Sequence, residues 1–441
     1  MKKIYFIGIG GISMSTLAVF LAVKGNVVSG SDLVVSENLK ILDNFGIKYN
    51  VGHEAQNIKS FNPNLVVTNC AISEENEEYH WAKANKKKIV TRSEILGKIA
   101  KDFRNVIAIS GTHGKTTTTA LVSEIFIEAG LKPSVHIGGI LKRTQSNFLI
   151  GEKKFFITEA CEYKNSFLSL SPTVGAVLNV EADHLDFFKD LSDIKSSFNK
   201  FLEQSKMQIF PKDEFVYILK KNGTETTYCA QNIRKNEKGY VFSFMENNNL
   251  IASIQTNFIG IHNVKNTLVA CVIARLYKIK PAIYKKAIRN FSGVKRRFET
   301  VTKIGKTTVI HDYAHHPTEI KKTIEEAKAF GKVLTVFQPH TFSRTKTLFS
   351  DFETCFNLSD SLFLIKTYPA REKEIKSASA EALYEKIKEK NMFNLTKYFD
   401  NFENAKKEII EQASSYDCVL VLGAGDICDL AYSLKNIKIY K

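Results

Sequence analysis

Short apolar runs alternate with amphipathic stretches along almost the whole chain, and this alternation constrains the fold more than any other feature. A strand, a helix and a second strand in succession form the repeating unit of parallel α/β sheets. The apolar runs that we expect to form strands are Lys3–Ile9, Asn26–Ser29, Leu65–Thr68, Lys88–Thr91, Val106–Ser110, Phe155–Thr158, Gly175–Val180, Thr307–Ile310, Lys332–Phe337, Ser361–Ile365 and Cys418–Leu422. The sequence therefore predicts an α/β protein with parallel sheets.

The chain is long enough for several domains. At about 150 residues per domain, its 441 residues correspond to about three. Polar segments rich in Asn and Lys, from about 211 to 258, interrupt the alternation and are expected to form a β excursion within the second domain. We predict a Rossmann-like domain at 1–103, a central P-loop ATPase-like domain with a mostly parallel sheet at 104–291, and a second Rossmann-like domain at 292–441.

The net charge of +16, from 62 basic and 46 acidic residues, would suit a protein that binds nucleic acid. However, only ten of the basic residues are arginine, which is the residue that usually forks onto phosphate and reads bases. The lysines are spread over the whole length. We interpret the charge as compositional bias, which is equally compatible with polyanionic small substrates, and we expect no nucleic-acid partner.

Cysteine spacing and the lengths of the apolar runs indicate the cellular compartment of the protein. The longest uninterrupted apolar runs, Leu17–Val23 and Leu268–Ala274, are too short to cross a bilayer of about 30 Å. The seven cysteines form no CxxC pair and no zinc-type spacing, which points to a reducing compartment. We therefore expect a cytoplasmic protein without a membrane partner.

The strongest local signal is the segment ISGTHGKTT at 109–117, which lies at an expected strand-to-helix junction. Its glycines allow backbone N–H groups to converge on phosphate oxygens. Lys115 is suited to neutralise terminal phosphates, and Thr116 offers a hydroxyl group to Mg²⁺. A full P-loop pattern would have glycine at position 109, where this chain has Ile109. A glycine turn with an incidental Gly-Lys-Thr sequence is the alternative.

P-loop chemistry also needs an acidic metal partner at the end of another strand. The run Phe155–Glu159 ends in a carboxylate, which predicts that Glu159 lies at the C-terminal edge of the sheet. Glu162 is near it, and a solvent-facing position is its alternative. The next strand leads to Asp183 and His184, in the region where ligands of parallel sheets bind.

The segment GIGGIS at 8–13, with Asp32 further along, nearly matches the dinucleotide-binding fingerprint. Ser13 replaces the third glycine, which weakens the interpretation as an NAD site and keeps a turn that can cradle phosphate. A site for a nucleotide diphosphate is therefore a better interpretation than a dehydrogenase site.

Three polar segments in the second half of the chain are further site candidates. His311 and His315 have the i,i+4 spacing of a helical zinc site, but they follow a strand and precede Pro317. A polar loop that reaches a ligand fits better, and a helix N-cap with incidental histidines is the alternative. Asn residues within 260–266 are suited to cap a helix or to read an adenine edge. Arg296 and Arg297 suit a phosphate contact, with an interdomain salt bridge as the plainer account.

Together these segments resemble the Mur ligase family, the ATP-dependent enzymes that form amide bonds in peptidoglycan synthesis. The resemblance covers essentially the whole chain and keeps the order of the motifs, which are GIGGIS at 8–13, GTHGKTT at 111–117, GIHN at 260–263, HDYAHHPTE at 311–319 and FQPHTFSR at 337–344. Within the family, the resemblance is greatest to the members that join L-alanine to the carboxylate of UDP-N-acetylmuramate through an acyl phosphate. It implies ATP and Mg²⁺ as cofactors.

The resemblance also implies roles for individual residues. The implied catalytic residues are Lys115, His184, Arg297, His315 and Arg344. The implied ATP contacts are Gly111, Thr112, His113, Gly114, Lys115, Thr116, Thr117, His262, Asn266, Arg297, Asp312 and Tyr313, of which those of the third domain would complete the site when the domains close. The implied UDP-sugar contacts are Gly8, Gly10, Gly11, Ser13, Asp32 and His53. The implied metal ligands are Thr116, Glu159 and His184.

Two positions differ from patterns in the family. Thr341 stands where many members carry Arg after the His of the Gln-Pro-His segment. Lys200 lies near the position of a carbamylated Lys in related ligases, although an ordinary surface Lys is the plainer interpretation. The competing functions are a ligase that attaches a recycled tripeptide to the same sugar, a regulatory P-loop NTPase and an NAD-dependent dehydrogenase.

Overall fold

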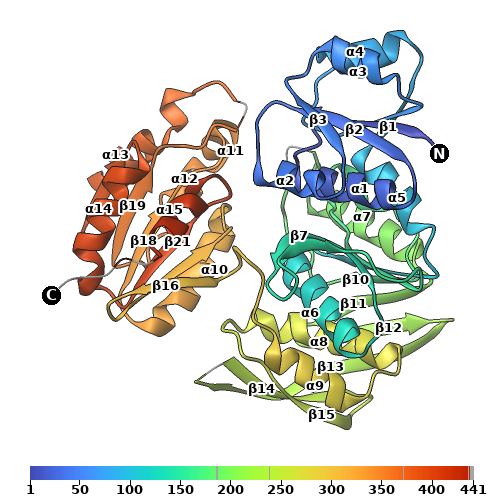
Figure 1. Ribbon diagram of the computed structural model, residues 1–441. Helices are drawn as coiled ribbons and strands as arrows, with labels where there is room; N and C mark the ends of the chain where they lie inside the picture. Colours follow the sequence, from blue (N-terminus) through green and yellow to red (C-terminus); the bar gives the residue numbers. More distant parts are fainter. Residues whose placement is uncertain (185–186, 238, 371, 436, 438–441) are drawn as a thin grey trace. The chain divides into compact units, whose positions relative to one another are not determined.

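The structure is a computed structural model that describes residues 1–184, 187–237, 239–370, 372–435 and 437. Its contacts divide the chain into two compact units, Met1–Ser292 and Gly293–Lys441. The first unit contains two sheets and the second contains one (Figure 1). These three sheets with their helices confirm the predicted three-domain α/β fold.

The N-terminal sheet is parallel throughout and has the strand order β3-β2-β1-β4-β5. The order reverses beside β1, as in Rossmann-type folds, which places a ligand crevice at the carboxyl ends of the strands. The strands are β1 (Lys3–Ile7), β2 (Val27–Asp32), β3 (Lys48–Val51), β4 (Leu65–Thr68) and β5 (Lys88–Thr91). The helices are α1 (Ile12–Val23), α2 (Glu37–Asp43), α3 (Ala55–Phe61), α4 (Glu77–Ala84) and α5 (Arg92–Ala100).

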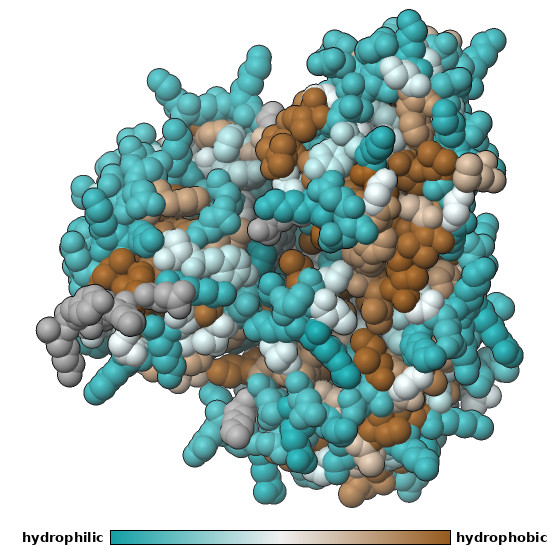
Figure 2. All heavy atoms as spheres, in the orientation of Figure 1, coloured by the Kyte–Doolittle hydropathy of each residue, from teal (hydrophilic) through white to brown (hydrophobic). Residues whose placement is uncertain are grey.

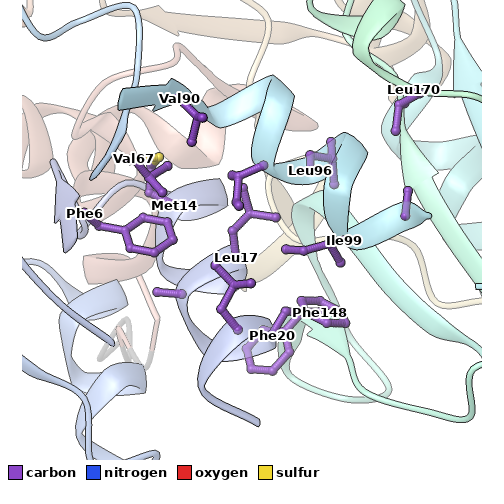
Figure 3. Packing of buried hydrophobic residues seen from close by; sticks show 14 of the residues in the cluster. Phe6, Met14, Leu17, Phe20, Val67, Val90, Leu96, Ile99, Phe148 and Leu170 are labelled. Atoms are coloured by element: carbon purple, nitrogen blue, oxygen red, sulfur yellow. The ribbon is translucent and has the colours of Figure 1, made fainter. Parts of the chain in front are cut away.

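Helix α1 joins the first two sheets into one unit. Most of its residues are buried. A helix that is apolar on nearly all sides needs packing partners on more than one side. Phe20 contacts Phe148 and Phe156 of the second sheet, with ring centroids 6.3 Å and 5.8 Å away. Figure 3 shows Phe20 and Phe148 together with Leu17 and Ile99. The hydrophobic core of the first unit therefore runs through α1 from one sheet to the other.

The second sheet is mixed and has the order β15-β14-β13-β12-β11-β10-β6-β9-β7-β8. Pairing is parallel among β11, β10, β6, β9 and β7, as predicted for the P-loop domain, and antiparallel from β11 to β15 and between β7 and β8. The predicted β excursion thus extends the sheet itself, so the whole sheet is mixed rather than mostly parallel. The strands are β6 (Asn105–Ser110), β7 (Ser134–Leu141), β8 (Ser146–Leu149), β9 (Phe155–Glu159), β10 (Val174–Val177), β11 (Met207–Asp213), β12 (Val216–Lys221), β13 (Thr224–Asn236), β14 (Gly239–Glu246) and β15 (Asn249–Gln255).

Four α-helices accompany the second sheet. They are α6 (Lys115–Glu128), α7 (Leu191–Glu203), α8 (His262–Leu276) and α9 (Pro281–Asn290). Helix α6 contacts both α8 and α9. Helix α6 follows β6 directly, which places its N-terminus at the carboxyl end of the parallel strands.

The second unit has the strand order β16-β17-β21-β18-β19-β20, in which the edge strand β16 is antiparallel and the others are parallel. Its strands are β16 (Glu299–Ile304), β17 (Thr307–Asp312), β18 (Val333–Phe337), β19 (Ser361–Ile365), β20 (Thr396–Phe399) and β21 (Cys418–Leu422). Its helices are α10 (Pro317–Ala327), α11 (Phe342–Thr347), α12 (Phe349–Phe352), α13 (Ala380–Glu389), α14 (Phe402–Gln412) and α15 (Ile427–Ser433). Hydrophobic clusters line both faces of this sheet.

The surface agrees with the lysine-rich composition. Hydrophilic residues cover most of the face shown in Figure 2, and the hydrophobic residues on it form separate groups. Within the described ranges, no helix has both the length and the apolar character that crossing a bilayer requires.

Candidate active site

The loop between β6 and α6 has the strand–loop–helix geometry predicted for segment 109–117. Gly111 has φ +140° and Gly114 has φ +84°, conformations that favour glycine. A Cβ atom on Gly114 would also lie 2.3 Å from Oδ1 of Asn266. Only glycine therefore fits at position 114, and the turn delivers the chain to the N-terminus of α6, where free N–H groups attract anions.

The segment after β10 holds this loop in place. The side chain of Asn179 accepts a hydrogen bond from the His113 N–H (2.8 Å) and donates one to the His113 carbonyl oxygen (3.0 Å). Thr112 Oγ1 accepts a bond from the N–H of Glu181 (2.9 Å). These side chain–backbone bonds shape the loop before any ligand binds, which lowers the cost of binding an anion.

The Lys115 ammonium group lies within the loop. It donates hydrogen bonds to the carbonyl oxygens of Gly111 (2.5 Å) and Thr112 (3.1 Å) and to Oε1 of Glu162 (3.0 Å). Burial by itself would lower the pKa of Lys115, but Glu162, assisted by Cys161, raises it above its ordinary value. Lys115 is therefore a cation at the N-terminus of α6, in position to meet phosphate.

Glu162, Asp183 and His184 form a cluster suited to a metal ion, and their ligand atoms all lie within 4.8 Å of one another. Nε2 of His184 is 4.0 Å from Oε1 of Glu162 and 3.8 Å from Oδ2 of Asp183. Oε2 of Glu162 is buried and has no hydrogen-bond partner among the described residues. Two carboxylates, one with an unpaired buried oxygen, fit the preference of Mg²⁺ for oxygen ligands.

The structure places the predicted metal ligands in different surroundings. His184 belongs to the cluster. Glu159 ends β9, and its Oε1 accepts the Gly138 N–H at 2.7 Å. Thr116 is buried at the second position of α6. Glu162, for which a solvent-facing position was the alternative, is only 2% exposed and lies in the cluster with Asp183 and His184.

The start of α8 adjoins the P-loop through Asn266. The Asn266 side chain is buried, donates a hydrogen bond to Oδ1 of Asn263 (3.0 Å) and directs its own Oδ1 at Gly114. His262 is exposed at the first position of α8, one turn before Asn266. Asn266 thus supports the loop, and His262 is the more accessible of the two predicted adenine contacts.

The glycine turn after β1 is closed by Asp32. Gly8 has φ +81°, and its N–H donates to the Ser31 carbonyl oxygen (2.8 Å). The Gly10 N–H donates to Oδ2 of Asp32 (2.8 Å), and a Cβ atom on Gly10 would lie 3.0 Å from that oxygen. Together with Gly11, the cap of α1, these residues lie at the carboxyl ends of β1 and β2.

Ser13, in the first turn of α1, meets two residues that the sequence analysis did not single out. Its Oγ lies 2.8 Å from Nε2 of His136 on β7 and accepts a hydrogen bond from Nη1 of Arg92 (3.3 Å). Nδ1 of His136 lies 3.1 Å from Oγ1 of Thr158, which itself donates to the Glu159 carbonyl oxygen. His136 Nδ1 therefore carries the hydrogen, and Ser13 donates its proton to Nε2. Arg92 adds a guanidinium group beside the N-terminus of α1, which favours anion binding there.

His136 should make folding sensitive to acid. Burial, with a smaller effect of Arg92, lowers the pKa of His136 to about 3, so the ring stays neutral in the folded protein. The unfolded chain takes up this proton as the pH falls below about 6.5, so stability is lost from there down to the folded pKa. We expect His136→Gln to remove about 2 kcal/mol of the stability difference between pH 7 and pH 5. Urea unfolding at the two pH values measures it, and an unchanged difference would contradict the assignment.

His53 follows β3 and belongs to a buried hydrogen-bond network. Its Nδ1 lies 2.8 Å from Oγ of Ser31 and 3.2 Å from Oε2 of Glu78 on α4. Glu78 carries no sequence motif and was not predicted as a site residue. The structure brings His53 and Asp32 to the same edge of the sheet through a hydrogen bond from the Gly52 N–H to the Asp32 carbonyl oxygen (2.8 Å).

In the second unit, Arg297, Asp312 and Tyr313 lie together. Asp312 ends β17, and its two oxygens accept the N–H groups of Phe298 and Ala314, both at 2.7 Å. The Tyr313 ring lies under the guanidinium group of Arg297, 5.2 Å from its carbon. Asp312 therefore organises the backbone that presents Arg297 and Tyr313.

His315 and Arg344 form a second group with His340. Nη1 of Arg344 lies 3.3 Å from Nδ1 of His340, and the rings of His315 and His340 are 6.1 Å apart. Burial and Arg344 lower the pKa of His340 to about 4, and burial is also the main cause that lowers the pKa of His315. Neutral imidazoles beside a guanidinium group suit the binding of a carboxylate together with an amine.

The remaining candidates of the second unit, His311 and Thr341, do not belong to the group of His315, His340 and Arg344. His311 is buried on β17, and its Nδ1 lies 3.0 Å from the Val421 carbonyl oxygen. Within the part of the chain that is described, no metal-type cluster includes His311 or His315. Thr341 supplies no cation and has φ +71°, an uncommon conformation for a β-branched residue. Lys200, in the first unit, is exposed on α7.

Comparison with known families and proteins gives consistent matches. The model of the Mur ligase family catalytic domain matches residues 3–104, the Mur ligase middle domain matches 109–274, and the Mur ligase glutamate ligase domain matches 296–425. A UDP-N-acetylmuramate–L-alanine ligase from Clostridium botulinum (strain Okra / Type B1) is 40% identical and covers 97% of this chain and 96% of its own. A ligase of the same name from Clostridium tetani is 41% identical with the same coverage.

Solved structures show the same similarity. A UDP-N-acetylmuramate–alanine ligase from Thermotoga maritima has a TM-score of 0.81 to this chain at 25% sequence identity, and the match covers 98% of both chains. A murein peptide ligase from Psychrobacter arcticus has a TM-score of 0.64 at 20% identity and covers 100% of both chains, which shows a shared fold.

Proposed function

Because the chain belongs to the Mur ligase family, we propose that it is the ATP-dependent ligase that joins L-alanine to the carboxylate of UDP-N-acetylmuramate and releases ADP and phosphate. The observation that carries the proposal is the cation Lys115 on its glycine loop, paired with Glu162 of a metal-type cluster. The full-length similarity to ligases of that name supports the choice of substrates. The product would be the precursor with the first amino acid of the peptidoglycan peptide.

Each of the three substrates is assigned to the domain built on one of the three sheets. Residues 1–103 bind the sugar nucleotide at the glycine turn, with Gly8, Ser13 and Asp32 as contacts. Residues 104–291 bind ATP at the P-loop, with His262 and Asn266 toward the adenine. Residues 292–441 bind the amino acid at the group around Arg344. The guanidinium of Arg92 supports the first assignment, since it stands beside the turn that would hold the diphosphate.

Activation of the carboxylate is the first chemical step. A muramate carboxylate oxygen attacks the γ-phosphorus of ATP, the bond from that phosphorus to the bridging oxygen breaks, and ADP leaves. Lys115 moves from the carbonyl oxygens of the loop to the phosphate oxygens and neutralises their charge. Glu162, Asp183 and His184 would hold Mg²⁺, which would supply further positive charge at the phosphates.

Amide formation follows on the acyl phosphate. The alanine amine attacks the acyl carbon to form a tetrahedral intermediate. The bond between that carbon and the phosphate oxygen then breaks, and inorganic phosphate leaves with the electron pair. Arg344 is suited to hold the alanine carboxylate. His315 directs its Nδ1 toward the Tyr313 carbonyl oxygen (3.0 Å), which leaves Nε2 with a lone pair to accept a proton from the incoming amine.

Substrate dependence tests the proposed function. We expect phosphate release from Mg·ATP only when UDP-N-acetylmuramate and L-alanine are both present, because the acyl phosphate needs the sugar carboxylate and its turnover needs the amine. The measurement is phosphate release with the sugar nucleotide and each of the twenty amino acids in turn. Release with a tripeptide alone would identify a recycling ligase instead, and release that needs neither substrate would identify a regulatory NTPase.

A further inference from the structure

A fully buried carboxylate lies under the face of the N-terminal sheet that α3 and α4 cover. Glu78, the second residue of α4, is 0% exposed. Its hydrogen-bond partners among the described residues are Tyr5, Ser31 and His53, and no Lys or Arg of that part of the chain pairs with it. A buried carboxylate is costly unless several donors compensate it, so its presence here calls for a reason beyond packing.

The donors around Glu78 determine which nitrogen of His53 carries hydrogen. The Tyr5 hydroxyl donates to Oε1 of Glu78 (2.6 Å), and the Ser31 hydroxyl donates to Oε2. Nδ1 of His53 lies 2.8 Å from the Ser31 oxygen and 3.2 Å from Oε2 of Glu78. Because the Ser31 proton is committed to Oε2 of Glu78, which is the acceptor of that bond, Nδ1 is the donor. Glu78 therefore sets both the tautomer and the orientation of the His53 ring.

The other ring nitrogen of His53 has no partner. Nε2 is buried without a hydrogen bond to any described residue, and the His53 side chain is only 7% exposed. Buried polar atoms in native proteins are nearly always paired with protein, water or ligand. His53 lies beside Asp32 at the carboxyl ends of the strands, where a sheet of this topology binds nucleotides.

We propose that Glu78 is a positioning residue for recognition of the nucleoside part of the sugar nucleotide. Its carboxylate holds the Nδ1–H of His53, so that Nε2 accepts a hydrogen bond from a hydroxyl or N–H group of the nucleoside. Glu78 does not touch the ligand and acts only through His53. The proposal rests on the proposed function, which assigns the UDP moiety to this edge of the sheet.

The test replaces Glu78 by glutamine, which keeps the shape of the side chain. One amide oxygen cannot serve three donors, and the amide NH₂ group repels the Nδ1–H of His53. We expect Glu78→Gln to raise the Kd for UDP about tenfold, which corresponds to the loss of about one ordinary hydrogen bond. The measurement is calorimetric titration of the full-length enzyme with UDP, and the KM for ATP should stay unchanged.

Tyr5→Phe is the matched control, because it removes a hydrogen bond from the same carboxylate at Oε1, whereas His53 bonds to Oε2. It should lower thermal stability and leave the Kd for UDP unchanged. In a His53→Ala background, Glu78→Gln should cause no further loss of affinity. Ser31→Ala is the milder variant if Glu78→Gln does not fold, and it should also weaken UDP binding.

The possible results distinguish failure of the positioning role of Glu78 from failure of the proposed function. If the wild-type enzyme binds UDP and Glu78→Gln binds it equally well, the positioning role is wrong and the proposed function stands. Equal losses of affinity in Tyr5→Phe and Glu78→Gln, or additive losses with His53→Ala, would likewise overturn the role. If the wild-type enzyme does not bind UDP or UDP-N-acetylmuramate, the proposed function itself fails.

Discussion

Replacement of Lys115 by alanine is expected to lower kcat by about 1000-fold or more, because no other cation in the loop meets the transferred phosphoryl group. The affinity for UDP-N-acetylmuramate should remain at its wild-type value, since the glycine turn after β1 is a separate part of the first unit. Phosphate release measures the first quantity, and calorimetric titration with the sugar nucleotide measures the second. Equal losses of turnover and sugar affinity would contradict the assignment of two separate nucleotide sites.

Two further variants make this result interpretable. Lys115→Ala leaves the buried Glu162 without its cation, which lowers stability, so the unfolding temperature must be recorded alongside activity. Lys115→Arg keeps the charge but not the compact ammonium group, and should fold and remain nearly inactive. Lys195, exposed on α7, is the matched control, and Lys195→Ala should behave as wild type.

Replacement of Glu162 by glutamine is expected to lower turnover by about 100-fold and to raise the Mg²⁺ concentration needed for half-maximal activity at least about tenfold. Glutamine retains an acceptor for Lys115, so the change mainly removes one negative charge from the cluster with Asp183 and His184. Phosphate release over a Mg²⁺ titration measures both effects.

Glu159→Gln is the informative comparison for this experiment. The family resemblance implies Glu159 as the metal ligand, whereas the structure pairs its carboxylate with the Gly138 N–H. We expect the Mg²⁺ requirement of Glu159→Gln to change much less than that of Glu162→Gln. The opposite ranking would make Glu159 the ligand and leave Glu162 as the partner of Lys115 alone.

Most of the strands that the sequence predicted share one physical property, and the edge strand β5 is an exception. Runs such as Val106–Ser110 and Cys418–Leu422 lie inside a sheet and are buried on both faces, so they appear as continuous apolar sequence. Of the strands that the apolar runs did not predict, β3, β8, β16 and β20 lie at sheet edges, whereas β7 lies inside the second sheet. The half-exposed residues of an edge strand, as in Lys48–Val51, do not produce an apolar run.

Some residues of the candidate site were likewise predictable from the sequence, and others were not. The P-loop was predictable because its glycines and Lys115 are contiguous, and the turn conformations that they need are local. Ser13 was predictable from its motif, but its partners were not. Arg92 and His136 lie 79 and 123 positions from Ser13 in the sequence and belong to no motif.

By itself, the sequence determined the α/β class, the three sheets and the position of the phosphate loop, because strand burial and turn chemistry depend on neighbouring residues. Only the tertiary structure decided that Glu162 lies beside Asp183 and His184, and that Glu78 lies within hydrogen-bond distance of His53. Whether a carboxylate is buried, and against which donor, depends on how distant segments pack. A hydrogen bond between Glu78 and His53 forms only after β4, the strand between them in the sequence, has joined the sheet.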